Sequence, residues 1–271
     1  MKSTLILLFL LITFTNQEIF LSEGKEEEKD QLQVEYQNLN EPEGDTVLCY
    51  PKELSSDKKH GVIVWAPGAG SKAGDYPQIM KRLASHGFVV IGLSSSPGDG
   101  SKATSLLNFL DEKYNQGSGP LSGKLDMDTV GCSGHSLGGL ECEQAIQKDK
   151  RIKTSILNNS GDFAHEAMSK VAEDRPMAIV YGNNGMERSN AEADYGNNGV
   201  KAPSCLIMMD GADHGHGSGP WDGMACTVAW FRWHLGEEDF RKADFVGTSG
   251  KYIDGNIIGH QGNWKGQCKN F

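Results

Sequence analysis

The sequence lacks the patterns that mark several classes of protein. None of the six cysteines has a partner at C-x-x-C spacing, which argues against a zinc site. No stretch after residue 14 approaches the ~20 apolar residues of a membrane-spanning helix. Positive charge is in the minority, and the net charge of -10 argues against binding to nucleic acid or to anionic membrane surfaces. The length of 271 residues is typical of a protein with one large α/β domain.

The N-terminus has the pattern of a secretory signal peptide. Lys2 precedes an apolar segment at 5–14 that is too short to span a membrane. We therefore expect residues 1–23 to be a signal peptide and the mature protein to be secreted, with an uncleaved anchor as the alternative. The Glu- and Lys-rich stretch that follows predicts a disordered acidic leader over 24–43. Residues 44–271 then form a single domain.

A secreted chain can form disulfides among its cysteines. We expect Cys268 to tie down the C-terminal segment, with Cys226 on the last predicted helix as its preferred partner. Cys132 lies in a predicted buried strand, and we expect it to be a packed thiol rather than half of a bridge. The other pairings stay open at this point.

Strand-like and helix-like segments alternate along the chain, which predicts a mainly parallel sheet with helices on both faces. Short apolar runs predict strands at 60–67, 88–93, 130–132, 152–157, 177–181 and 205–209. Apolar residues at three- to four-residue spacing or aromatic-rich composition predict helices at 76–86, 101–114 and 224–235. The pentapeptide Tyr-Gly-Asn-Asn-Gly occurs at 181–185 and at 195–199, and both copies are typical of turns.

One glycine-rich motif points to catalysis. Residues 134–138 read Gly-His-Ser-Leu-Gly and fit G-x-S-x-G, the strand-to-helix turn that exposes a nucleophilic serine. A predicted strand at 130–132 precedes the motif and a helix-compatible segment at 140–146 follows it, as this turn requires. A glycine-rich turn that merely contains a serine is the alternative. We therefore predict that Ser136 is a nucleophile.

A histidine that could act as the base lies late in the chain. Histidine has a suitable pKa for taking the serine proton, and in proteins with this turn the base comes last, on a loop after a strand. The predicted strand at 205–209 leads into a glycine-rich loop with two histidines. We favour His214, the first to emerge, over His216. His135 and His260 are poorer candidates.

Two backbone N–H groups are candidates for stabilising an oxyanion. One belongs to Leu137, directly after the serine. The other belongs to the glycine-rich loop 67–71, which follows the predicted strand 60–67, and there we choose Ala69. An ordinary tight turn is the alternative for this loop. The chemistry calls for no metal and no organic cofactor.

Five short motifs occur together in this chain. They are Gly-His-Ser-Leu-Gly-Gly at 134–139, Pro-Gly at 67–68, Leu-Ala-Ser-His-Gly-Phe-Val-Val at 83–90, Gly-Lys-Leu-Asp at 123–126 and Gly-Ala-Asp-His at 211–214. Together they resemble a known family, the secreted α/β-hydrolases of the polyesterase–lipase–cutinase group. The resemblance extends over about 45–250 and implies the α/β-hydrolase fold. It also implies the roles given above to Ser136, His214 and the two oxyanion donors.

The acid expected from this resemblance is missing from its usual place. The family carries it about three residues after the glycine that ends the strand before the histidine strand. Here that glycine is Gly182, and residues 183–185 are Asn-Asn-Gly. The nearest carboxylate belongs to Glu187, which we favour. Asp162, Asp194 or an asparagine in place of the carboxylate are the alternatives.

The substrate cleft also departs from the family pattern. Relatives that cleave aromatic polyesters usually carry an aromatic residue where this chain has Ala69, and often a second one where residues 158–160 are Asn-Asn-Ser. An aromatic clamp for a terephthalate-like ring is therefore not evident. Residues 158–160 also form a glycosylation sequon. We expect it to be unused because it lies close to the site.

These residues together predict a secreted serine esterase. Ser136 attacks an ester carbonyl, His214 transfers the proton, and water hydrolyses the acyl-enzyme. The expected partner is a small-molecule or polymeric ester, with no nucleic acid and no stable membrane insertion after signal cleavage. The alternative is an α/β-hydrolase-fold binding protein that has lost efficient catalysis, which the missing acid suggests.

Overall fold

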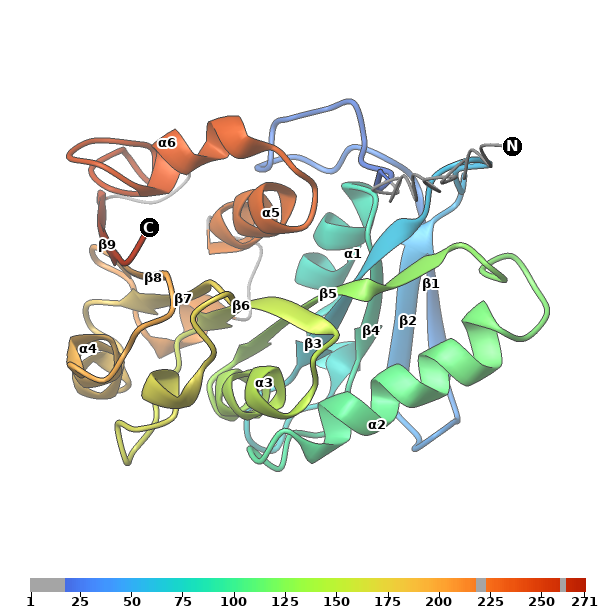
Figure 1. Cartoon of the computed structure of the whole chain (residues 1–271), viewed down its shortest axis with the longest axis horizontal. Helices are drawn as coiled ribbons and strands as arrows, with labels where there is room; N and C mark the ends of the chain where they lie inside the picture. The colour runs from blue at the N-terminus through green and yellow to red at the C-terminus, as the bar shows by residue number, and fades with distance from the viewer. Residues whose placement is uncertain (1–17, 218–222, 259–261) are drawn as a thin grey trace, which may run out of the picture.

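A nine-stranded sheet forms the centre of the molecule, with helices on both faces (Figure 1). The computed structural model describes residues 18–217, 223–258 and 262–271. In sheet order the strands are β1 (Val34–Leu39), β2 (Thr46–Pro51), β4 (Val89–Gly92), β3 (His60–Ala66), β5 (Leu125–His135), β6 (Ile152–Asn158), β7 (Met177–Gly182), β8 (Ser204–Met209) and β9 (Trp264–Lys269). Neighbours from β4 to β8 are parallel, whereas β1–β2, β2–β4 and β8–β9 are antiparallel. This arrangement confirms the predicted α/β-hydrolase fold.

Two sets of helices bury separate apolar cores on the two faces of the sheet. One set is α1 (Pro77–Ser85), α5 (Gly223–His234) and α6 (Lys242–Phe245); the other is α2 (Ser101–Leu110), α3 (Leu137–Lys148) and α4 (Arg188–Gly196). Ile63 and Trp65 of β3 join the first core, and Val62 and Val64 join the second. Burial on both faces explains why such a strand is continuously apolar in sequence.

The shorter helical segments lie in the connections between these elements. Four are 3-10 turns, at Ala73–Asp75, Met168–Lys170, His214–Gly217 and Asp239–Arg241. A π-helical segment, Asp111–Asn115, continues α2 and completes the helix predicted at 101–114. The first copy of the repeated pentapeptide ends β7 and turns, whereas the second ends α4 before turning.

The predicted strands and helices are present, and β5 is longer than predicted. Three strands, β1, β2 and β9, and two helices, α4 and α6, were not predicted. β1 and β9 are largely polar edge strands, so they lack the apolar run that identifies a buried strand. α4 is short and polar, and of its residues only Ala191 and Asp194 are buried.

The prediction of a disordered leader over 24–43 is wrong. The strand β1 lies within this segment and pairs with β2. Glu27 is buried, and its carboxylate lies 3.2 Å from Arg241 and 2.7 Å from Lys251. Basic side chains from the C-terminal part of the chain therefore neutralise the buried charge of Glu27. These ion pairs join residues that are distant in sequence, so the sequence pattern could not predict them.

The predicted signal peptide, 1–23, lies mostly outside the described residues. Its last part is described, and it packs on the domain. The Phe20 N–H donates to the Lys59 carbonyl at 2.8 Å, and the Ser22 N–H donates to the His86 carbonyl at 3.1 Å. The expected boundary at residue 23 therefore falls within a segment that the domain holds by hydrogen bonds.

Both disulfide expectations are wrong in their pairing. Cys268 of β9 does anchor the C-terminal segment, but its partner is Cys205, directly opposite on β8. Cys132 is bridged to Cys142 and joins β5 to α3. Cys226 is a buried free thiol in the core beneath α5. The pairing depends on β9, an edge strand that the sequence pattern did not reveal.

Candidate active site

Ser136 lies at the sharp turn between β5 and α3. Its backbone has φ 54° and ψ −119°, a conformation that an ordinary residue rarely adopts. A Cβ at Gly138 would collide with the Ala66 carbonyl, and one at Gly134 would lie 2.5 Å from the carbonyl carbon of Gly138. Glycine at both positions lets the helix approach the strands closely. The turn thereby places the serine at the carboxyl edge of the sheet.

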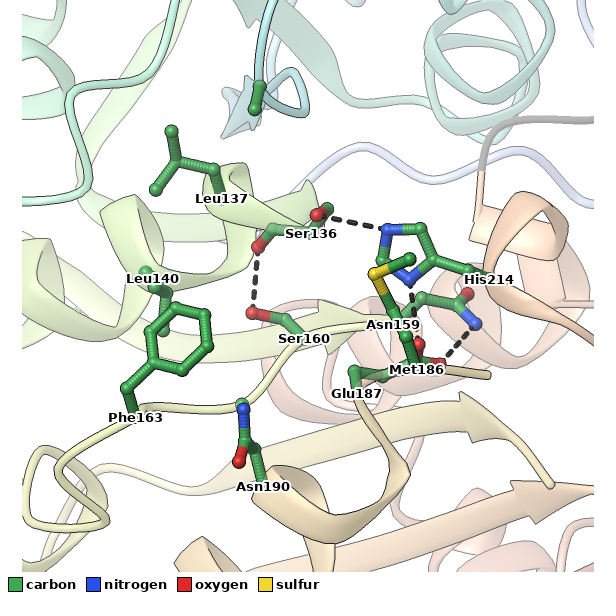
Figure 2. A pocket seen from close by; sticks show the side chains of 12 residues that line it. Ser136, Leu137, Leu140, Asn159, Ser160, Phe163, Met186, Glu187, Asn190 and His214 are labelled. Carbon is green, nitrogen blue, oxygen red and sulfur yellow. Dashed lines mark hydrogen bonds and ion pairs between the residues drawn. The ribbon is translucent and has the colours of Figure 1, made fainter. Parts of the chain in front are cut away.

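His214 lies between Ser136 and Glu187 (Figure 2). Its Nε2 is 3.1 Å from the Ser136 Oγ, and its Nδ1 is 2.7 Å from the Glu187 Oε2. The Glu187 side chain is only 5% exposed, so water screens its charge weakly. The structure therefore brings together three predicted site residues from three separate loops, in a continuous series of hydrogen bonds.

A tight turn after β7 explains how Glu187 reaches the histidine. The Gly185 N–H donates to the Gly182 carbonyl at 3.0 Å and closes the turn. A Cβ at Gly185 would overlap the Glu187 carboxylate, so only glycine leaves room for that carboxylate to fold back. Asn183 lies beside β8's end instead, where its Nδ2 donates to Asp210 Oδ1 at 2.8 Å. The acid therefore comes from beyond the turn, not from within it.

Asn159 supports the carboxylate and was not predicted to do so. Its Nδ2 donates to the Glu187 Oε1 at 2.7 Å and to the Asp213 carbonyl at 3.1 Å. The side chain is buried, and the backbone has φ 50°. Asn159 thus joins the acid to the loop 210–217, which carries His214 and is called the histidine loop below. Its position directly after β6, at the same sheet edge as Ser136, was the only signal in the sequence.

The alternative acids hold other groups. The Asp162 carboxylate accepts hydrogen bonds from the backbone N–H groups of Ala164, Glu166 and Ala167. Asp194 lies 3.0 Å from the His165 Nδ1, and burial raises the pKa of this carboxyl to about 6. Both carboxylates therefore organise the loop that follows β6. The side chain of His216, the alternative base, lies outside the described part of the structure.

The two predicted oxyanion donors border the same cavity as the serine. Ala69 lies on the loop 67–71, called the oxyanion loop below, and Leu137 begins α3. The Ser96 hydroxyl donates to the Pro67 carbonyl at 2.7 Å and fixes the start of the oxyanion loop. Backbone N–H groups at these two positions can face a carbonyl oxygen that is bound beside the Ser136 Oγ.

The family assignment follows from a comparison with known proteins. A family model described as PET hydrolase-like matches residues 29–263. The chain belongs to the PET hydrolase-like family. It is 33% identical over 116 residues to the bis(hydroxyethyl) terephthalate hydrolase of Streptomyces coelicolor, an alignment that covers 42% of this chain and 36% of that protein.

Two bacterial cutinases are also similar to this PET hydrolase-like chain. Cutinase 2 of Thermobifida cellulosilytica and cutinase cut1 of Thermobifida fusca are each 29% identical to it over 99 residues. These alignments cover 35% of this chain and 37% and 30% of the two cutinases. The chain thus matches about a third of the length of these curated relatives.

The cavity of this PET hydrolase-like protein is half-open and mainly apolar. Its volume is about 260 Å³, and apolar side chains from separate loops face it. Phe163 and Met186 are each 80% exposed and flank it, with Leu140 on the same side as Phe163 (Figure 2). Phe163 is an aromatic residue at the cavity that the sequence analysis did not identify. It lies three residues past 158–160, the positions at which relatives that cleave aromatic polyesters often carry their second aromatic residue.

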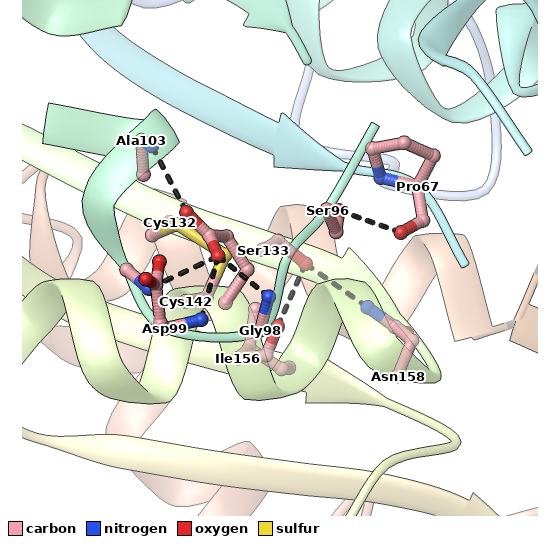
Figure 3. The surroundings of a disulfide bond; sticks show 12 residues. Pro67, Ser96, Gly98, Asp99, Ala103, Cys132, Ser133, Cys142, Ile156 and Asn158 are labelled. Atoms are coloured by element: carbon pink, nitrogen blue, oxygen red, sulfur yellow. Dashed lines mark hydrogen bonds between the residues drawn. A yellow bond between two sulfur atoms is a disulfide. The ribbon is translucent and has the colours of Figure 1, made fainter. Parts of the chain in front are cut away.

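Figure 3 shows the disulfide Cys132–Cys142 and the hydrogen bonds around it. Cys132–Cys142 joins the strand and the helix that flank Ser136. Nearby, Asn158 Nδ2 donates to the Ser133 Oγ at 3.0 Å. Asn158 is the sequon asparagine and is only 2% exposed. Its amide is therefore inaccessible to glycosylation in this folded PET hydrolase-like chain.

Neither a metal cluster nor a membrane span is present in the described ranges. No three or more His, Cys, Asp or Glu side chains among those residues are arranged to hold a metal ion. None of the described helices of this PET hydrolase-like chain is long and apolar enough to cross a membrane.

Proposed function

We propose that this protein is a secreted serine hydrolase that cleaves carboxylic esters through an acyl-enzyme. The observation that carries the proposal is the hydrogen-bond series from Ser136 through His214 to Glu187. Membership in the PET hydrolase-like family and similarity to cutinases support the same reaction class. The carboxylate beside His214 also supports this function over that of a binding protein that has lost catalysis.

The first half of the reaction uses the serine and the histidine. His214 Nε2 accepts the Ser136 proton as the Oγ attacks the ester carbonyl. The N–H groups of Ala69 and Leu137 stabilise the oxyanion of the tetrahedral intermediate. The imidazolium then donates its proton to the departing alcohol oxygen. In the second half, His214 activates a water molecule that hydrolyses the acyl-enzyme.

Glu187 stabilises the histidine in the form that the reaction needs. Its carboxylate accepts a hydrogen bond from the Nδ1–H of His214, which leaves Nε2 free to act as the base. As the imidazole becomes charged, the adjacent negative charge stabilises it. Asn159 holds the carboxylate by donating to its other oxygen, so the acid is oriented before substrate binds.

The proposed substrates are esters with a modest apolar acyl or aromatic part. Phe163, Met186 and Leu140 give the cavity its apolar surface, and its half-open form admits a group that extends past its edge. The named relatives act on cutin-type or bis(hydroxyethyl) terephthalate esters according to their names. We extend only the ester linkage and the apolar character of these substrates to this chain.

The proposal is tested by hydrolysis of p-nitrophenyl acetate and butyrate. The mature protein should release p-nitrophenol well above background, and Ser136→Ala should reduce the rate to background. Equal rates for the two proteins would refute the esterase function. Circular dichroism of both proteins shows whether the variant keeps its fold.

Secretion is tested separately, by expressing the full chain in a secreting host. The mass of the protein recovered from the medium gives the cleavage site. We expect the exported chain to retain Phe20 and Ser22, because both are hydrogen-bonded to the domain. A protein that stays with the cell membrane would instead support the uncleaved anchor.

A further inference from the structure

A buried hydrogen-bond series connects the oxyanion loop to the histidine loop. The Gly68 N–H donates to the Tyr76 hydroxyl oxygen at 3.0 Å. The Tyr76 hydroxyl lies 3.0 Å from the His135 Nδ1, and the His135 Nε2 lies 2.9 Å from the His214 carbonyl oxygen. The two loops flank Ser136, and this series joins them through two side chains that the mechanism above does not use.

The two ends of this series fix which group donates and which accepts in each hydrogen bond. A backbone N–H can only donate and a carbonyl oxygen can only accept, so both ends are fixed. The Tyr76 hydroxyl accepts from Gly68 and can then donate to His135 Nδ1, while Nε2 carries the hydrogen that is donated to His214. Burial lowers the pKa of His135, which favours this neutral form.

Packing leaves little freedom for these groups to move. Tyr76 is 3% exposed and His135 is 8% exposed. The His135 ring lies 4.9 Å from the His214 ring, centroid to centroid. A Cβ at Gly68 would lie 3.0 Å from His135 Nδ1 and 3.1 Å from the Tyr76 hydroxyl, so the loop approaches as closely as a residue without a side chain permits.

We propose that Tyr76 and His135 are positioning residues that hold the oxyanion loop and the histidine loop in fixed positions on either side of Ser136. Neither loop contains a strand, so no strand ladder sets the distance between the Ala69 N–H and the His214 ring. The series Gly68–Tyr76–His135–His214 sets it instead. Neither Tyr76 nor His135 takes up a proton from the substrate; their effect passes through the two loops.

Tyr76→Phe is the main test, because it removes one oxygen atom and keeps the ring. We expect kcat for p-nitrophenyl butyrate to fall roughly tenfold or more while KM stays within about twofold, since displaced catalytic groups impair the transition state more than substrate binding. His135→Gln, which lacks the acceptor at Nδ1, should lower kcat similarly. In that background Tyr76→Phe should add little, because the hydroxyl has already lost its acceptor.

Tyr252→Phe is the matched control. Tyr252 is also buried, its hydroxyl donates to Glu27 at 2.9 Å, and neither residue borders the cavity at Ser136. Both Tyr→Phe variants should lose thermal stability, but only Tyr76→Phe should lose kcat. Equal kcat values in the two variants, or fully additive losses in Tyr76→Phe/His135→Gln, would overturn the proposal. Should Tyr76→Phe not fold, the kcat of His135→Gln decides.

This inference rests on the proposed esterase function, and the same assay separates the two. Wild type and Ser136→Ala are measured beside the Tyr76 and His135 variants. No difference between wild type and Ser136→Ala would refute the esterase function itself. Activity that depends on Ser136 but is unaffected by Tyr76→Phe would overturn only the positioning roles.

Discussion

The carboxylate of Glu187 lies 2.7 Å from Nδ1 of His214, although the two residues belong to loops that follow different strands. The contact depends on Gly185, since any side chain there would occupy the space of the carboxylate. The acid lies a few residues later than in the family pattern, and the turn at Gly185 still brings its carboxylate to the histidine. The histidine keeps its partner while the local sequence departs from the family pattern.

Glu187→Gln should lower kcat by about two to four orders of magnitude, because an amide does not carry the charge that stabilises the imidazolium. The measurement is steady-state hydrolysis of p-nitrophenyl butyrate. Glu192→Gln on α4 is the matched control, since Glu192 binds Arg188 and Tyr181 rather than the histidine. If Glu187→Gln and Glu192→Gln have equal activity, Glu187 is not the acid.

Phe163→Ala should change chain-length preference rather than chemistry. The ring is 80% exposed at the cavity and can cover the far part of an acyl group. We expect kcat/KM to fall up to about tenfold for p-nitrophenyl hexanoate and to stay near wild type for the acetate. Phe240→Ala, at another exposed ring, controls for loss of surface aromatic area. A uniform loss across all chain lengths would contradict a role in acyl binding.

Stability should fall as the pH drops from 6.5 towards 4. His86 is fully buried between Arg232 and the Lys29 carbonyl, and burial lowers its pKa from 6.5 to about 4. Across that window the unfolded chain binds a proton that the folded chain does not, so the free energy of unfolding is highest above pH 6.5.

His86→Asn keeps an acceptor for Arg232 but cannot titrate. It should be less stable than wild type at pH 7, with a shallower loss between pH 6.5 and 4. Urea unfolding at several pH values measures both slopes. Identical slopes would show that His86 does not contribute to the acid sensitivity.

Removing either disulfide should reduce stability by an amount that depends on loop length. The chain-entropy relation gives about 3 kcal/mol for Cys132–Cys142, with a sequence separation of 10, and about 4 kcal/mol for Cys205–Cys268, with a separation of 63. Urea unfolding of the two double-alanine variants gives both values. Cys226→Ala measures the cost of losing one buried sulfur without a bridge. Each double-alanine variant removes two sulfurs. If its loss of stability is no larger than twice that of Cys226→Ala, the cross-link itself contributes nothing and the prediction is wrong.

The central strands and the serine turn could be predicted because their signals are local. β3 and β8 are buried on both faces and are therefore continuously apolar, and the turn at Ser136 needs its glycines at fixed spacing. β1 and β9 are polar edge strands whose pairing depends on tertiary contacts. The partner of Cys268 could not be found without β9.

The site was predictable only where a residue's role follows from its place along the chain. Ser136 comes directly after β5 and His214 lies on the loop that follows β8, and the sequence identified both as candidates. Glu187 was one of several candidates, because its reach depends on the turn at Gly185. Asn159 and Phe163 follow β6, but only the folded loop shows that one supports the acid and the other faces the cavity.

The most direct test of the account is covalent labelling of the nucleophile. The mature protein is treated with a p-nitrophenyl alkylphosphonate, and the adduct is located by peptide mass spectrometry. We predict one adduct per chain on Ser136, a much slower reaction in Glu187→Gln, and no adduct in Ser136→Ala. An adduct on another residue, or equal labelling of wild type and Ser136→Ala, would contradict the assignment of Ser136 as the activated nucleophile.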